Sequence, residues 1–251
     1  MRCTILNRLL LTCLLALGLT APALAAETQV AVAANFTEPA KEIAAGFQRA
    51  TGHRAILSFG ASGAFYAQIA HGAPFEVFLS ADAERPAQAE KDGFVVPRTR
   101  FTYAIGRLVL YSPDPVLIDG RGIVLRRGIF DKLAIADPAA APYGLAAIQT
   151  INALGLGGTV GPRLVKGASI AQAFQFVQSG AAQLGFVAQS QVIGIAGGSR
   201  WLVPADLHAP IEQQAVLLKT GAANPVARAF LTYLRGPEAR AVIQRYGYEI
   251  R

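Results

Sequence analysis

The feature that most constrains the fold of this chain is a repeated alternation of short apolar segments with segments of helical periodicity. A first apolar run at residues 29–33 is followed by Pro39, in a sequence typical of a helix start because proline is favoured in the first turn. Gly52 then stands where a helix C-cap is expected, and a second apolar run follows at residues 55–59. The alternation continues to the end of the chain and predicts an α/β protein with mostly parallel strands.

The same periodicity defines the other expected elements. Strands are expected at residues 29–33, 55–59, 76–80, 103–111, 133–136, 164–165, 184–188, 201–203 and 214–218. Helices are expected at residues 37–51, 64–72, 83–91, 143–154, 170–179, 225–234 and 237–246.

Residues 1–25 resemble a secretory signal peptide rather than a part of the fold. Arg2 and Arg8 precede an apolar stretch at residues 9–19, and Ala23-Leu24-Ala25 supplies a cleavage pattern of small residues. The apolar stretch is shorter than the roughly 20 residues that a membrane-spanning helix needs. We therefore expect an exported protein, cleaved near Ala25.

Removal of this leader changes the chemistry that is available to the mature chain. Cys3 and Cys13 both lie in the leader, so no disulfide and no cysteine-ligated metal is expected after cleavage. The mature chain keeps 21 Lys and Arg residues against 16 Asp and Glu residues. Its arginines form only loose clusters without interleaved aromatic residues, so no nucleic-acid partner is expected.

Catalytic and metal-binding patterns are weak. Gly60-Ala61-Ser62-Gly63 lies between a strand and a helix, as a nucleophilic serine does in many hydrolases. Ala64, however, stands where that pattern requires a second glycine, and of the three histidines His53 and His71 lie near expected helix ends. An exported serine hydrolase that uses Ser62 therefore stays a minor alternative. We expect a protein that is not an enzyme, that has no cofactor and that provides no direct ligands to a metal.

Four junctions between a strand and the following helix carry small or neutral hydrogen-bonding residues. Such junctions gather at the carboxyl edge of the strands in open α/β sheets, where ligands bind. The free N–H groups of the following helices suit an anion, although none of the four junctions has Arg, Lys or His at its centre. The four junctions are Ala34-Asn35, Ala61-Ser62-Gly63, Pro142-Tyr143-Gly144 and Ala168-Ser169-Ile170.

Several of these segments, together with others, resemble motifs of one family in the same order along the chain. The first is the run Val30-Ala31-Val32-Ala33-Ala34-Asn35-Phe36-Thr37. The later ones are Ser58-Phe59-Gly60-Ala61-Ser62-Gly63, Gly72-Ala73-Pro74, Phe78-Leu79-Ser80-Ala81-Asp82, Ala136-Asp137-Pro138, Pro142-Tyr143-Gly144, Leu184-Gly185-Phe186-Val187, Tyr233-Leu234-Arg235-Gly236-Pro237 and Arg245-Tyr246-Gly247-Tyr248. In this order they are similar to the ModA family, the periplasmic molybdate-binding proteins of ABC transporters.

The resemblance implies a periplasmic binding protein fold of type II, the Venus-flytrap arrangement. It implies a mixed, mostly parallel sheet in each of two lobes and two crossing strands as the hinge. Lobe 1 would hold residues 26–104 and 204–251, and lobe 2 would hold residues 105–203. The expected function is capture of molybdate, and of tungstate, by a monomer that delivers the ion to an inner-membrane permease.

The resemblance also implies a set of residues that bind the oxyanion. Asn35, with Ala34 before it, and Ser62 would donate hydrogen bonds from the first two junctions. Tyr143 would donate its backbone N–H, with its hydroxyl as a further candidate, and Ile170 would donate its backbone N–H. Molybdenum would be present only as the oxyanion.

One position departs from the family pattern. Some members have a tyrosine after the last strand of the second lobe, where this chain has Ala188. The Ala188 side chain is therefore expected to lie outside the site, and Tyr143 is expected to replace the tyrosine donor that those members have. A protein of the same fold that binds sulfate, phosphate or another small anion remains the main alternative.

Overall fold

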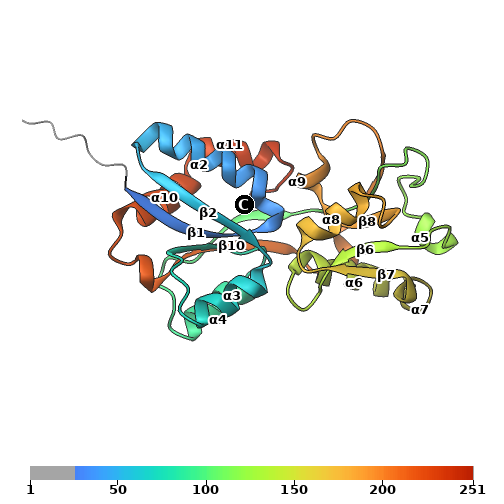
Figure 1. The fold of residues 1–251 in the computed structure, drawn as a ribbon, viewed down its shortest axis with the longest axis horizontal. Coiled ribbons are helices and arrows are strands. Elements are labelled where there is room, and N and C mark those ends of the chain that lie inside the picture. The colour runs from blue at the N-terminus through green and yellow to red at the C-terminus, as the bar shows by residue number, and fades with distance from the viewer. Residues whose placement is uncertain (1–25, 251) are drawn as a thin grey trace, which may run out of the picture.

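The computed structural model describes residues 26–250, so the expected leader lies outside the described residues. Two five-stranded sheets, each with its own helices, lie one after the other along the longest axis of the molecule (Figure 1). Among residues 26–250, no helix is both long enough and apolar enough to cross a bilayer.

The first sheet is built from both ends of the chain, in the order β2-β1-β3-β10-β4. Its strands are β1 (Glu27–Ala33), β2 (Arg54–Gly60), β3 (Val77–Leu79), β4 (Phe101–Gly106) and β10 (Ile211–Leu217). Helices α2 (Thr37–Thr51), α10 (Pro225–Arg235) and α11 (Pro237–Arg245) cover one face, and α3 (Ser62–Ala70) and α4 (Glu84–Lys91) lie on the other (Figure 1).

The second sheet is built from the middle of the chain, in the order β7-β6-β8-β5-β9. Its strands are β5 (Leu108–Ser112), β6 (Leu133–Ala136), β7 (Leu164–Gly167), β8 (Leu184–Ala188) and β9 (Ser199–Leu202). Its helices are α5 (Val124–Arg127), α6 (Pro142–Ala153), α7 (Gly157–Val160), α8 (Ile170–Gln178) and α9 (Gln189–Val192).

Both sheets follow one pattern of strand directions. In the first sheet β10 runs antiparallel to both of its neighbours, and in the second sheet β5 does the same. The other pairs are parallel, so four of the five strands in each sheet point the same way. This confirms the expected α/β class with mixed, mostly parallel sheets.

The helices pack on the sheets through apolar residues spaced by about one helical turn. In α2, Ile43 and Phe47 are buried, and the Phe47 ring contacts the Phe230 ring of α10 edge-to-face, with 5.4 Å between their centroids. Gly52 ends α2 in the left-handed conformation, with a φ of 75°, which a residue without Cβ adopts without steric cost.

The chain passes between the two sheets twice. The expected single strand at residues 103–111 is two strands, β4 and β5, which belong to different sheets and are separated by Arg107. The return passage covers residues 203–210, between β9 and β10. The C-terminal segment lies at the first passage, where Ile105 and Glu249 exchange two main-chain hydrogen bonds of 2.8 and 3.1 Å.

Candidate functional site

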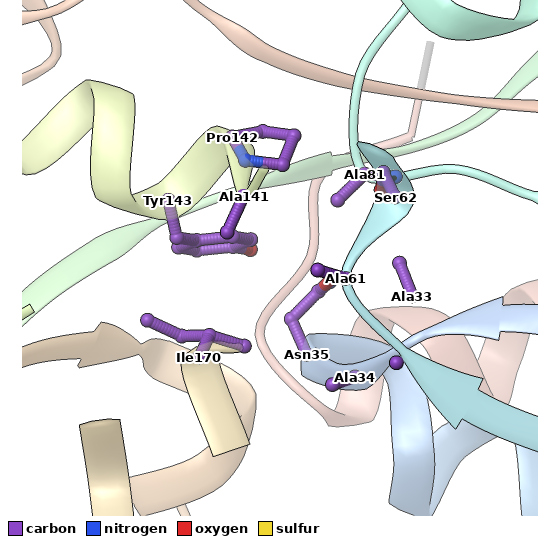
Figure 2. Close-up of a pocket in the computed structure, with 11 residues that line it drawn as sticks. Ala33, Ala34, Asn35, Ala61, Ser62, Ala81, Ala141, Pro142, Tyr143 and Ile170 are labelled. Carbon is purple, nitrogen blue, oxygen red and sulfur yellow. Dashed lines mark hydrogen bonds between the residues drawn. The ribbon is translucent and has the colours of Figure 1, made fainter. Parts of the chain in front are cut away.

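A small pocket lies between the two sheets, at the ends of strands that lead into helices (Figure 2). Its cavity volume is about 10 Å³, about that of one water-sized sphere and far below the range of about 300–1,000 Å³ that is common for sites of drug-sized ligands. Its lining contains no Lys, Arg, His, Asp or Glu. The residues that line it are Ala33, Ala34, Asn35, Gly60, Ala61, Ser62, Ala81, Ala141, Pro142, Tyr143 and Ile170.

All five residues that the sequence singled out line this one pocket, and they reach it from four junctions. Ala34 and Asn35 lie in the 3₁₀ turn Ala34–Phe36 after β1. Ser62 and Ile170 are the first residues of α3 and α8, and Tyr143 is the second residue of α6. Backbone N–H groups in the first turn of a helix have no partner within that helix, so these positions offer donors to a ligand.

Ser62 is held with its hydroxyl proton unused by the protein. Its side chain is 1% exposed, and its Oγ accepts a 2.9 Å hydrogen bond from the backbone N–H of Ala81. A hydroxyl has one proton to donate besides its two acceptor lone pairs. The contact with Ala81 therefore orients Ser62 while leaving it able to donate to an acceptor in the pocket.

Asn35 belongs to a buried network of neutral polar groups behind the pocket. Its Nδ2 donates to Gln213 Oε1 and to the Tyr248 hydroxyl, both at 2.9 Å, whereas its Oδ1 has no partner. Gln213 is fully buried; its Nε2 donates to the Tyr143 hydroxyl at 3.2 Å, and its Oε1 accepts from the Tyr103 hydroxyl at 3.0 Å. Gln213 thus connects Asn35 with Tyr143.

The tyrosines of this network carry no charge at neutral pH. Burial raises the pKa of Tyr103 and of Tyr143 well above their ordinary value, and burial raises the pKa of Tyr248 to about 12. Their hydroxyls stay protonated because a phenolate without compensating charge is poorly solvated in such surroundings. The pocket and the network behind it therefore form a neutral environment rich in hydrogen-bond donors.

Main-chain and side-chain contacts join the two halves of the molecule beside the pocket. The backbone N–H of Gly63 donates to Ala140 O at 2.9 Å, and Arg85 Nη2 donates to Ala139 O at 2.9 Å. A Cβ at Gly63 would lie 3.1 Å from the Cα and O atoms of Ala140. The absence of a side chain at Gly63 thus allows the close approach of the two backbones.

A second group of contacts involves the backbone of Asn35. Ser190, which follows β8, donates from Oγ to Asn35 O at 2.8 Å. The Tyr248 hydroxyl lies 2.8 Å from Asn35 O and 2.9 Å from Ser190 Oγ. The backbone around Asn35 is thereby connected to the second half of the molecule.

Gly106, at the end of β4, creates the space that the Tyr143 hydroxyl occupies. A Cβ built on Gly106 would overlap the Tyr143 hydroxyl and would lie 2.8 Å from Gln213 Nε2. Tyr143 therefore reaches Gln213 only because position 106 has no side chain.

Sequence reasoning missed the residues of the network behind the pocket. Gln213, Tyr103 and Ser190 were not singled out, and Tyr248 appeared only within a family motif. Gln213 stands between Glu212 and Gln214 in the polar first half of β10, so its sequence context gives no signal that its side chain is buried. Ala188 does not line the pocket; its N–H donates to Gln191 Oε1 at 2.9 Å.

The surroundings of Ser62 lack the machinery of a serine hydrolase. None of His53, His71 and His208 lines the pocket, and the Ser62 hydroxyl has Ala81 N–H as its neighbour instead of a general base. A nucleophilic serine requires a base within hydrogen-bond reach.

Two α/β halves around a small neutral pocket define a binding protein that encloses a small solute between its halves. Consistent with this, the sequence profile described as bacterial extracellular solute-binding protein matches residues 28–249, and the chain belongs to this family.

Two relatives and one solved structure that resemble this chain are named as molybdate-binding proteins. The molybdate-binding protein ModA of Rhodobacter capsulatus is 56% identical over 93% of this chain and 92% of its own length. ModA of Azotobacter vinelandii is 54% identical over 93% of this chain and 94% of its own length. The solved structure of the periplasmic molybdate-binding protein of Azotobacter vinelandii superposes with a TM-score of 0.86 and 42% identity, over 89% of this chain and 99% of that chain.

Proposed function

We propose that this protein binds molybdate, and also tungstate, in the pocket between its two halves and delivers the ion to an inner-membrane ABC permease. The observation that carries the proposal is that Asn35, Ser62, Tyr143 and Ile170 reach one small pocket without any charged side chain. The relatives named for molybdate binding match this chain over nearly its whole length, which supports the choice of ligand.

Neutral donors are sufficient for such an ion. A hydrogen bond to a charged partner contributes about 1.5–3 kcal/mol, against about 1 kcal/mol for a neutral pair. Several such bonds from Ser62 Oγ and from the first turns of α3, α6 and α8 offset the several kcal/mol that desolvation of the anion costs. Donors held at fixed positions also favour one ion size, because bonds to a smaller oxyanion are too long.

The proposal extends to the organisation of the whole protein. The first sheet with its helices forms one lobe and the second sheet with its helices forms the other, with the two passages between the sheets as the hinge. The first passage lies at Arg107 and not after residue 104, because β4 extends to Gly106. The protein acts as a monomer in the periplasm after removal of residues 1–25. The solute stabilises the closed arrangement through contacts that both lobes make with it.

Isothermal titration calorimetry of the exported, ligand-free protein tests the ligand. We expect tight binding of molybdate and tungstate, and much weaker binding of sulfate and phosphate. A preference for sulfate or phosphate would assign the protein to the alternative ligand, and turnover of esters that is lost in Ser62→Ala would assign it to the hydrolases.

A further inference from the structure

Asn35 presents the wrong atom to an anion in the arrangement described above. Both Nδ2 protons are used by Gln213 and Tyr248, and the unpartnered atom is the acceptor Oδ1. Asn35 is 2% exposed and lines the pocket. An oxyanion such as molybdate offers only acceptors, so it would meet an acceptor at this position.

A half-turn of the two carboxamides resolves this conflict without moving any other heavy atom. The oxygen and nitrogen of an amide then exchange places. Asn35 Oδ1 accepts from Gln213 Nε2 and from the Tyr248 hydroxyl, across the same 2.9 Å separations, and Asn35 Nδ2 faces the pocket. Gln213 Oε1 accepts from the Tyr143 hydroxyl across 3.2 Å.

The remaining partners accommodate the exchange. The Tyr103 hydroxyl, 3.0 Å from Gln213, accepts from Nε2 and donates to Ser80 O at 3.2 Å. Ser190 Oγ donates to Asn35 O, which frees the Tyr248 proton for Asn35 Oδ1. With an oxyanion bound to Asn35 Nδ2, no polar atom of the network is left without a partner, and Asn35 Oδ1 loses the unpartnered state that costs about 1–3 kcal/mol for a buried group.

We propose that Gln213 is a positioning residue whose orientation decides whether Asn35 or Tyr143 donates a hydrogen bond into the pocket. A bound oxyanion selects the arrangement in which Asn35 donates to it and the Tyr143 hydroxyl donates to Gln213. The reciprocity follows from the amide itself. When Gln213 Nε2 faces Tyr143, its Oε1 faces Asn35 and requires Asn35 Nδ2 as the donor. When the Gln213 amide is turned, its Oε1 faces Tyr143 and its Nε2 faces Asn35, which then presents Oδ1. This inference rests on the proposed function only in that the ligand is an oxyanion.

Two substitutions at position 213 separate this role from simple packing. Gln213→Glu has the same shape but offers only acceptors when ionised, so it holds Asn35 Nδ2 away from the pocket. We expect its molybdate affinity to fall at least tenfold. Gln213→Met has similar length and no hydrogen bond, so it leaves Asn35 without a preferred orientation, and we expect a loss of about 2- to 10-fold.

Gln214→Glu is the control for a carboxylate introduced elsewhere on β10. Gln214 is the next residue of β10, and its Oε1 accepts from Arg100 Nη1 at 2.9 Å, away from Asn35. We expect this variant to bind molybdate within twofold of the wild type. Tyr143→Phe should lose less affinity than Ser62→Ala, because the Tyr143 hydroxyl donates to Gln213 in the bound state.

A nuclear magnetic resonance experiment reports on the surroundings of the Asn35 side-chain amide. Among residues 26–251 the only asparagines are Asn35, Asn152 and Asn224, so protein labelled with [¹⁵N]asparagine gives three side-chain amide signals. On addition of molybdate we expect the Asn35 signal to shift in the wild type and not in Gln213→Glu. Asn152 and Asn224 serve as internal references.

The outcomes distinguish this inference from the proposed function. If the wild type binds molybdate but its Asn35 signal stays in place, or if Gln213→Met binds as the wild type does, the positioning role is wrong and the proposed function stands. If the wild type binds a different oxyanion, the proposed ligand is wrong and the same comparison with that ion decides the role of Gln213. If no oxyanion binds, both fail.

Discussion

Replacement of Ser62 by alanine should weaken oxyanion binding by a defined amount. The substitution removes one hydroxyl donor whose proton has no protein acceptor and whose Oγ is held by Ala81 N–H at 2.9 Å. One hydrogen bond to a charged partner is worth about 1.5–3 kcal/mol, which corresponds to a rise in Kd of about 10- to 150-fold. Isothermal titration calorimetry with molybdate measures this rise.

The same substitution also affects stability, and a control must separate the two effects. Ser62→Ala leaves the buried Ala81 N–H without its acceptor, which costs about 1–3 kcal/mol in the free energy of unfolding of the ligand-free protein. Ser112→Ala is the matched control. Ser112 is fully buried in the second sheet, and its Oγ donates to Gln183 O at 2.6 Å, away from the pocket.

We expect both serine variants to be destabilised in urea denaturation, and only Ser62→Ala to lose affinity. An unchanged Kd for Ser62→Ala would remove Ser62 from the site. An equal loss of affinity in both variants would show that lowered stability, and not a missing donor, weakens binding.

Three further predictions follow from the geometry. Gly106→Ala should displace the Tyr143 hydroxyl and lower the free energy of unfolding by about 1–3 kcal/mol, the usual cost of overpacking; urea denaturation that finds wild-type stability contradicts this. The free energy of unfolding should fall above pH 10, because the buried tyrosines keep their protons in the folded protein at pH values where the unfolded chain loses them. The fall should be about 1.4 kcal/mol per pH unit for each such tyrosine. A flat profile of stability between pH 10 and 12, measured by denaturation, would contradict the raised pKa values. Asn224 caps α10, because its Oδ1 accepts a 2.9 Å hydrogen bond from the backbone N–H of Val226. Asn224→Ala should therefore lower the free energy of unfolding by about 1–2 kcal/mol and leave the molybdate affinity unchanged.

The local pattern of the sequence was sufficient to predict most of the fold. Strand and helix positions follow from periodicity, and Gly52 marks the end of α2 because only a residue without Cβ tolerates its backbone conformation easily. The pattern could not show that residues 103–111 form two strands. Both strands are apolar, and Arg107 interrupts them by one residue, so their separation into different sheets depends on long-range pairing.

The candidate site could be predicted only in part. The residues at the four junctions share a local signature, a small or neutral residue at the start of a helix, which sequence reasoning can recognise. Gln213 and Tyr248 have no such signature, because they come from a distant strand and the C-terminal segment. Their proximity to Asn35 arises from the return of the chain to the first sheet.

The neutral lining of the pocket has a consequence for the protein as a whole. None of the side chains that line the pocket is charged, so a doubly charged oxyanion binds without proton uptake by a charged group of the lining, and its charge adds in full to that of the protein. The mature chain, with 21 basic and 16 acidic side chains, thus becomes two units less positive when it is loaded. Loaded and empty forms should therefore migrate differently in a native electric field, and a membrane partner meets two forms of the same protein that differ in overall charge as well as in shape.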